Sequence, residues 1–304
     1  MIDFTPTLTV AIITYNHKDT VGKTIESVLS QRTDFPVLIE IWDDCSTDGT
    51  SEICARYAKD SAGKIVHVLQ KKNTFFEPLD KWSFYENYKK IKSKYFYVIE
   101  GDDYLTDDTF FSSAVNYLEG HADCGIYAAR VRMVDLKKRS AVELPEMPGD
   151  EIIVRIEDIG TGRYAFPLIQ SRVMRNYHVE FLTGDLPMYL YHLTRGYCKI
   201  ANKICAVYNY TGGGIWSELS SDISEKLYQS TFYRMVQYYG FKHENAWFKM
   251  LYKKNRRIIR RLSYVVGRRL AWKVWFVFYM VPTFGKASLN KYWNYTSYTR
   301  KSRA

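Results

Sequence analysis

Short apolar runs alternate with helical segments through the first hundred residues, and this alternation constrains the fold more than any other feature. The apolar runs are 8–13, 37–42, 64–69 and 95–99. They are rich in β-branched and aromatic residues, as buried strands are. Between them, apolar residues recur at helical spacing, for example from about Thr20, where the threonine is a candidate helix cap. A β-α-β-α-β-α-β order predicts an α/β fold, with a mostly parallel sheet and helices on both faces.

The alternation loosens after residue 120. Within the regular part, a helix is expected at 79–91, before the fourth strand. Beyond it, we expect strands at 124–134, 151–156 and 204–210, and helices at 108–118 and 184–195. From 219 to 262 the pattern is helical and increasingly basic, and no internal repeat or Gly/Ser-rich linker interrupts the chain before it. The sequence therefore predicts one globular domain over 1–218 and a helical, basic, aromatic-rich region over 219–304.

Polar clusters follow three of the expected strands. They are Thr14-Tyr15-Asn16, Asp43-Asp44 and Glu100-Gly101-Asp102-Asp103. In an open parallel sheet, ligands bind outside the carboxyl ends of the strands, where all three clusters would meet. Each cluster alone could be a strand-to-helix turn, in which Asp and Asn are common. Three of them at one edge favour a ligand site.

The cluster at 100–103 has the most specific chemistry. Adjacent carboxylates repel one another unless a cation neutralises them, and Mg²⁺ or Mn²⁺ is the natural partner. Gly101 would remove a side chain where a ligand or metal approaches. The chain contains neither a P-loop nor a dinucleotide-binding fingerprint, so phosphates would be held through the metal.

As an ordered set, these motifs resemble the inverting glycosyltransferases of family 2, which have the GT-A fold. The matching segments are Val10–Asn16, Thr24–Gln31, Ile41–Thr50 and Glu100–Tyr104, and the resemblance extends over about residues 7–217. It implies an enzyme that takes a sugar from a nucleotide-diphosphate donor, most often a UDP-sugar, with the help of a divalent metal.

The resemblance also implies roles for individual residues. Those expected to hold the nucleotide are Thr14, Tyr15, Asn16 and Asp43. From its position after the third strand, Lys71 is a further candidate nucleotide contact, and the alternative is a solvated surface residue. Asp103 corresponds to a metal ligand, and Asp102 to a residue that contacts the metal and the ribose or sugar. Glu100 departs mildly from the acidic residue usual at its position.

The family also implies a general base, for which Asp185 is the candidate. An inverting transfer is an in-line displacement, so the acceptor hydroxyl must lose its proton on the face opposite the departing diphosphate. Asp185 would begin a helix, which gives it a rigid mount; the alternative role is a helix cap. The segment Tyr208–Ser217 resembles the family's closing loop, but Asn209 and Thr211 stand where Arg and His are common.

The net charge of +10 is concentrated at one end of the chain. Residues 251–304 contain 14 Lys or Arg and no Asp or Glu, whereas residues 1–250 have a net charge of −4. The apolar stretch 270–284 is shorter than the ~20 residues that span a bilayer. With its tryptophans and upstream arginines it suits a peripheral membrane anchor. The alternative is a helical region packed on the domain. No nucleic-acid-binding motif accompanies the charge, so we expect no nucleic-acid partner.

Compartment and pathway follow from these expectations. The five cysteines are scattered and the N-terminus lacks a secretory signal, which favours the cytoplasmic face of the inner membrane. The acceptor would be a hydroxyl of a glycan or lipid-diphosphate-linked glycan in surface polysaccharide synthesis. The alternatives are a nucleotidyltransferase of similar fold and a non-catalytic, membrane-associated binding protein.

Overall fold

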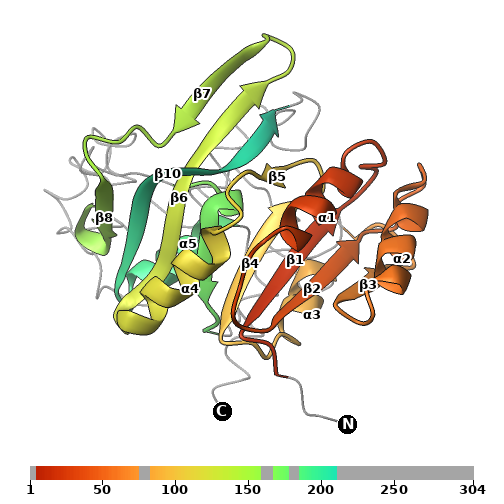
Figure 1. Ribbon diagram of the computed structural model, residues 1–304, viewed down its shortest axis with the longest axis horizontal. Coiled ribbons are helices and arrows are strands. Elements are labelled where there is room, and N and C mark those ends of the chain that lie inside the picture. Colours follow the sequence, from red (N-terminus) through yellow and green to blue (C-terminus); the bar gives the residue numbers. More distant parts are fainter. Residues whose placement is uncertain (1–4, 75–82, 159–166, 178–184, 211–304) are drawn as a thin grey trace, which may run out of the picture. The chain divides into compact units, whose positions relative to one another are not determined.

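The computed structural model describes residues 5–74, 83–158, 167–177 and 185–210 (Figure 1). These residues belong to two compact units. The first contains residues 5–74, 83–154, 167–177 and 191–210, and the second contains 155–158 and 185–190. The sheet lies in the first unit apart from Arg155, the last residue of one strand.

The described helices and strands follow one another in the expected alternation. In chain order they are β1 (Leu8–Thr14), α1 (Val21–Leu29), β2 (Val37–Asp43), α2 (Thr50–Asp60), β3 (Ile65–Leu69), α3 (Ser83–Tyr88), β4 (Tyr95–Glu100), β5 (Tyr104–Leu105), α4 (Phe110–Gly120), β6 (Cys124–Asp135), β7 (Ser140–Leu144), β8 (Glu151–Arg155), β9 (Arg172–Arg175), α5 (Asp185–Leu193) and β10 (Tyr197–Tyr210). Short 3-10 turns lie at Ile156–Asp158 and Ile169–Ser171.

The strands form one sheet in the order β3-β2-β1-β4-β9-β6-β10-β5, with β7 beside β6 and β8 beside β10. The first four strands of this order are parallel, and so is the β6–β10 pair. Strand β9 runs antiparallel to β4 and β6, while β5 and β7 are antiparallel to their partners. The predicted α/β class, with a large and mostly parallel sheet, is confirmed.

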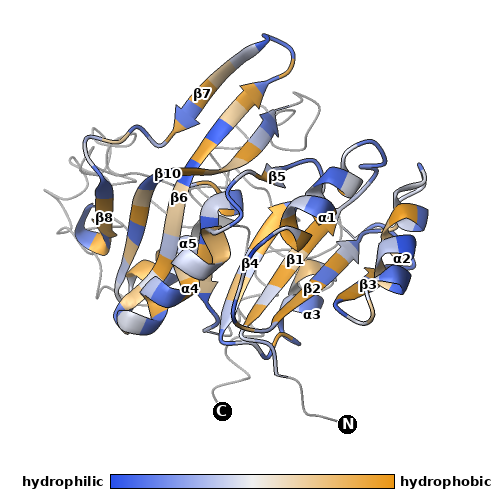
Figure 2. Ribbon diagram, in the orientation of Figure 1, coloured by the Kyte–Doolittle hydropathy of each residue, from blue (hydrophilic) through white to orange (hydrophobic). Residues whose placement is uncertain are grey.

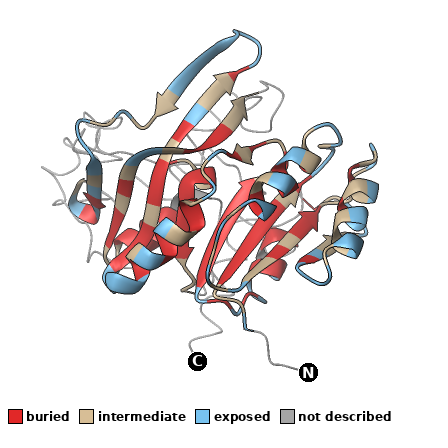
Figure 3. Cartoon of the chain, viewed as in Figure 1, coloured by how far each residue is buried: buried red, intermediate tan, exposed pale blue. Residues whose placement is uncertain are grey.

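Helices cover both faces of the sheet. On one face, Val21 and Ile25 of α1 share a buried cluster with Val10 and Ile12 of β1. On the other face, the Trp42 ring lies 5.3 Å from Phe84 of α3 and 6.1 Å from Phe96, centroid to centroid. Strand β1 is therefore hydrophobic along almost its whole length and buried (Figures 2 and 3). Each fully buried aliphatic side chain contributes about 1.5–3 kcal/mol.

Several elements differ from the sequence-based expectation. Strands β5, β7 and β9 were not predicted, and β10 begins at Tyr197, well before the expected 204. The helix expected over 79–91 is described only as α3, because 75–82 lie outside the described residues. The expected helical region over 219–304 also lies outside them, so the domain boundary at 218 stays a prediction. In the part of the chain that the structure describes, no helix is both long enough and apolar enough to cross a membrane.

Candidate active site

The three polar clusters meet at one edge of the sheet. Strand β1 lies between β2 and β4, and all three strands run in the same direction. In the register of these strands, Thr14 pairs with Asp43 and Ile13 pairs with Glu100. The carboxyl ends of β1, β2 and β4 therefore place their polar residues side by side, as the sequence predicted.

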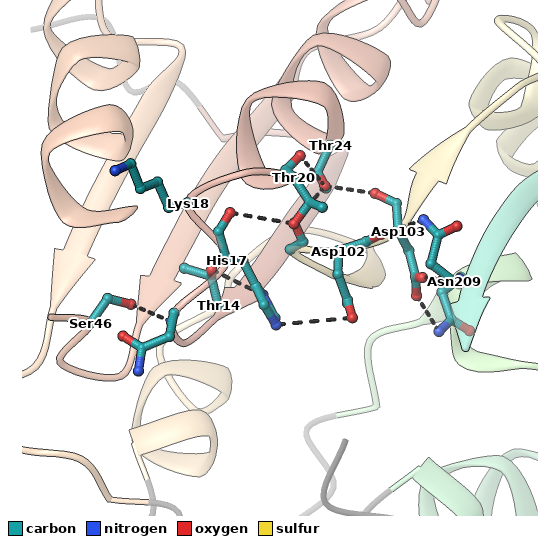
Figure 4. A network of polar contacts seen from close by, with 12 residues as sticks. Thr14, His17, Lys18, Thr20, Thr24, Ser46, Asp102, Asp103 and Asn209 are labelled. Atoms are coloured by element: carbon teal, nitrogen blue, oxygen red, sulfur yellow. Dashed lines mark hydrogen bonds and ion pairs between the residues drawn. The ribbon is translucent and has the colours of Figure 1, made fainter. Parts of the chain in front are cut away.

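The acidic turn after β4, residues 100–103, brings three carboxylates together. One ligand oxygen from each of Glu100, Asp102 and Asp103 lies within 4.8 Å of the others. Asp103 is fully buried, whereas the other two are partly exposed. Gln170 Nε2 donates to Asp103 Oδ2 over 2.5 Å. The Asn209 backbone N–H donates to Asp103 Oδ1 over 2.8 Å (Figure 4). The Asn209 side chain also donates to the Asp102 carbonyl oxygen, over 2.6 Å.

Helix α1 holds the backbone of the acidic turn. Thr24 Oγ1 lies 2.9 Å from the carbonyl oxygen of Gly101 and 2.6 Å from that of Asp103. Thr20 Oγ1 donates to the same Gly101 carbonyl over 2.9 Å (Figure 4). Thr20 occupies the N-cap position of α1 but forms no capping hydrogen bond with its side chain. The predicted cap position is therefore right, but the hydroxyl forms a hydrogen bond with the acidic turn and does not cap the helix.

Residue 101 must be a glycine because the side chains of Thr14 and His17 occupy the space where a Cβ atom would lie. A Cβ atom at this position would lie 2.7 Å from both Thr14 Oγ1 and His17 Nδ1. The space beside Gly101 is therefore filled by the loop after β1, and not by a ligand as the sequence suggested. His17 lies between Thr14 Oγ1, 3.3 Å from its Nδ1, and Asp102 Oδ2, 4.0 Å from its Nε2.

Asp43 is fully buried at the end of β2 and is held by protein groups on both oxygens. Oδ1 accepts a hydrogen bond from the Ser46 backbone N–H over 2.9 Å. Oδ2 accepts one from Ser51 Oγ and lies 3.4 Å from His67 Nε2. Burial alone would raise the pKa of Asp43, but the hydrogen bonds from these three partners lower it from 3.8 to about 2.

The loops after β1 and β2 are joined to each other. Asn16 Oδ1 accepts a hydrogen bond from the Thr47 N–H over 2.9 Å, and the Asn16 N–H donates to Ser46 Oγ over 2.9 Å. Asn16 and Cys45 have φ angles of 57° and 68°. This left-handed backbone is uncommon for residues other than glycine, though Asn tolerates it well. The two loops therefore form one surface at the edge of the sheet.

The remaining loop residues are more exposed. Tyr15 is 44% exposed, and Lys71 is exposed in the segment after β3. Asp48 accepts hydrogen bonds from the backbone N–H groups of Lys18 and Thr50, each over 3.0 Å. Asp48 is therefore a turn residue just before α2.

The charge balance of the acidic turn favours a cation. Burial, followed by the negative charges of Glu100 and Asp102, raises the pKa of Asp103 well above its ordinary value. Each Asp103 oxygen accepts one hydrogen bond from the groups described above, and a carboxylate oxygen offers about two acceptor positions. Three clustered carboxylates fit a hard divalent ion such as Mg²⁺ or Mn²⁺, which prefers oxygen ligands.

The structure thus brings most of the predicted site residues to one edge. Asp185 is the first residue of α5 and belongs to the second unit, so its role stays a prediction. Gln170 was missed, and Asn209 was considered only as a departure from the closing loop. Gln170 stands 67 positions from Asp103, and Asn209 stands 106 positions from it. No local pattern could have revealed these contacts.

This chain is similar to proteins from two Mycobacterium species. A Mycobacterium bovis protein, Uncharacterized protein Mb1547, is 25% identical over 225 residues, which are 71% of this chain and 62% of that protein. Uncharacterized protein Rv1520 of Mycobacterium tuberculosis matches to the same extent. This chain therefore spans 62% of the length of these relatives.

Solved structures of TarS from S. aureus have a similar fold. Residues 1–349 of TarS in complex with UDP superpose with a TM-score of 0.55 at 14% identity, covering 76% of this chain and 65% of that one. A second structure of the same fragment gives a TM-score of 0.56, covering 88% of this chain and 77% of that one. The family described as Glycosyl transferase family 2 matches residues 9–189. With more than half of its length matched, this chain belongs to glycosyl transferase family 2.

Proposed function

We propose that this glycosyltransferase moves a sugar from a nucleotide-diphosphate donor, a UDP-sugar, to a hydroxyl group of a glycan. The acidic turn carries the proposal. Three carboxylates within 4.8 Å of one another, at the carboxyl edge of a parallel sheet, suit a divalent ion and a diphosphate. Asp102 and Asp103 would hold the ion. When bound, it would neutralise the negative charge that develops on the departing diphosphate.

The loops after β1, β2 and β3 supply the nucleotide pocket in this proposal. Thr14, Tyr15 and Asn16 would contact the base and ribose, and Lys71 would contact the nucleotide from the next loop. Because Asp43 is fully buried, it would act by holding Ser46 beside Asn16. The TarS fragment, whose fold is similar, has been solved with UDP and with UDP-GlcNAc, which supports UDP as the nucleotide.

Asp185 would be the general base. It is the first residue of α5, and a residue on a helix of the scaffold is held more rigidly than one on a loop. It would accept the proton of the acceptor hydroxyl as that oxygen attacks the anomeric carbon and the bond to the diphosphate breaks. The anomeric carbon of the sugar is then bonded to the acceptor oxygen, and UDP leaves.

The acceptor in this proposal is a lipid-diphosphate-linked or other surface glycan, reached at the cytoplasmic face of the inner membrane. The 14 basic residues of 251–304 support it, since they would attract an anionic membrane. The enzyme would then act in surface polysaccharide synthesis as a peripheral membrane protein.

A thermal-shift screen of UDP and UDP-sugars, with and without Mn²⁺, tests the function. We expect Mn²⁺ together with UDP to raise the melting temperature, and a UDP-sugar to release UDP when acceptor glycans are supplied. Release of pyrophosphate from a nucleoside triphosphate would instead identify a nucleotidyltransferase. No response to any nucleotide would favour a non-catalytic binding protein.

A further inference from the structure

Gln170 is a buried polar residue that the sequence did not connect with the site. It lies in the 3-10 turn Ile169–Ser171 before β9 and is only 2% exposed. Its backbone carbonyl accepts a hydrogen bond from Tyr97 Oη of β4 over 2.7 Å. This backbone contact does not involve the Gln170 side chain, so the turn is anchored independently of it.

The two polar atoms of the Gln170 amide differ in their hydrogen bonding: Nε2 has a partner, and Oε1 has none among the described residues. Nε2 donates to Asp103 Oδ2 over 2.5 Å, and this is the orientation that a carboxylate requires, since it only accepts hydrogen bonds. Oε1 is buried and has no hydrogen-bond partner among the described residues. A buried acceptor without a donor is unfavourable, and most are satisfied by protein or water. The side chain thus contacts the acidic turn and keeps one acceptor available beside it.

We infer that Gln170 is a positioning residue for the metal-binding carboxylate Asp103, an inference that rests on the metal site of the proposed function. Its N–H fixes the direction of Oδ2, which leaves the remaining acceptor positions of Asp103 for the cation. Its Oε1, which has no partner among the described residues, would be available to a water molecule of the bound ion, since Mg²⁺ sites commonly retain water. Residues that orient metal ligands in this way change metal affinity by about 10–100-fold when they are mutated.

The side chain fits this role better than a purely structural one. A structural glutamine satisfies both ends of its amide, as Gln31 does. Gln31 Nε2 donates to the Asp107 carbonyl over 2.6 Å, and its Oε1 accepts from the Phe111 N–H over 3.1 Å. Gln31 therefore provides a control, since it is a glutamine in the same unit whose amide binds backbone groups and not the acidic turn.

The test measures Mn²⁺ binding to the full chain by calorimetry, with Q170M and Q31M compared with the unmodified protein. Methionine keeps the length and approximate volume of glutamine but removes the amide. We expect Q170M to weaken Mn²⁺ binding by about 10-fold or more, and Q31M to leave it unchanged. Thermal melting shows whether each variant is folded. Should Q170M unfold, Y97F provides a milder change that removes only the hydroxyl hydrogen-bonded to the Gln170 carbonyl, and it should weaken Mn²⁺ binding in the same direction.

The outcomes separate the two proposals. If the unmodified chain binds Mn²⁺ and folded Q170M binds it within about twofold, Gln170 does not position the site and only this inference fails. Equal losses in Q170M and Q31M would also overturn it, since the effect would then be one of stability. If the unmodified chain does not bind Mn²⁺, the metal site of the proposed function fails, and this role fails with it.

Discussion

His67 on the edge strand β3 places its Nε2 3.4 Å from Oδ2 of the fully buried Asp43 at the end of β2. The contact joins the outer strand to the edge of the sheet that carries the site. It is one of three that lower the pKa of Asp43 to about 2. The ionised carboxylate is therefore part of the folded structure.

This pKa predicts how stability depends on pH. A carboxyl group with a lowered pKa stabilises the fold above its unfolded value of 3.8, and that contribution is lost as the pH falls towards about 2. We expect Asp43→Asn to lower the free energy of unfolding by about 2 kcal/mol at neutral pH. Urea denaturation across this pH range measures the difference, which should shrink below pH 3.8. The exposed Asp34→Asn serves as control, and an effect of equal size there would contradict the prediction.

Gly101→Ala tests the contact between the acidic turn and the loop after β1. The new methyl group would lie 2.7 Å from Thr14 Oγ1 and His17 Nδ1, so the loop must shift. We expect a loss of about 1–3 kcal/mol of stability, measured by urea denaturation. Gly120, at the end of α4, has no heavy atom within 4 Å of an added Cβ. Gly120→Ala should therefore be neutral or stabilising, and equal losses in both variants would argue against the contact.

The cysteines should differ sharply in reactivity. All five are free thiols, and Cys45 is the one that is not buried. Burial raises the pKa of Cys54 to about 12, and it also raises the pKa values of Cys124 and Cys205. Because the thiolate is the reactive form, iodoacetamide should label the native protein at Cys45, as read by mass spectrometry. Cys45→Ser should remove the label. Comparable labelling of Cys54 in the native state would show that the core opens readily.

Variants of Asp103 and Asp185 should distinguish the binding of UDP from the transfer of the sugar. Asp103→Asn removes a proposed metal ligand, so Mn²⁺-dependent UDP binding and sugar transfer should both be lost. Asp185→Asn removes the proposed base, so transfer should fall by about 100-fold or more while UDP binding remains. Thermal shift and UDP release report the two properties. Asp108→Asn, an exposed position paired with Arg32, should change neither. A wild-type transfer rate in Asp185→Asn would exclude it as the base.

The basic segment 251–304 should direct the protein to anionic membranes. Replacing Arg256, Arg257, Arg260 and Arg261 by Gln removes four positive charges, each contributing on the order of 1 kcal/mol near an anionic surface. Flotation with phosphatidylglycerol vesicles should show binding of the unmodified chain and weaker binding of the variant. High salt should weaken the interaction as well, because it screens charge. Equal flotation of both proteins would favour the alternative, a helical region packed on the domain.

The elements that the sequence predicted well are those whose apolar residues form continuous runs. Strands β1, β2 and β4 each extend only one residue beyond the expected range. A strand that is buried on both faces appears in the sequence as a continuous run of apolar residues, so its limits are easy to predict. Strand β9 is four residues long and begins with Arg172, a fully buried arginine, so its composition does not resemble a central strand. The outer strand β7 is largely exposed and lacks the apolar signal (Figure 3).

The site, like the fold, contains residues that the sequence predicted and residues that it did not. Residues that follow the parallel strands could be grouped in advance, because strand direction places them at a common edge. Their hydrogen-bond partners could not be grouped, because Gln170 and Asn209 reach the acidic turn only through the pairing of β9 and β10 with other strands. Fold class follows from local pattern, whereas the environment of Asp103 follows from long-range packing.

The distance along the chain between Asp103 and its two donors has a consequence for biosynthesis. As the polypeptide leaves the ribosome, β1 to β4 emerge first and already bear the acidic turn. The carboxylate of Asp103 gains Gln170 and then Asn209 only after much more of the protein has been made. Closing contacts between such distant segments is slow compared with local folding. A nascent or truncated chain that ends before residue 170 therefore carries the acids of the turn without either of the groups that orient Asp103.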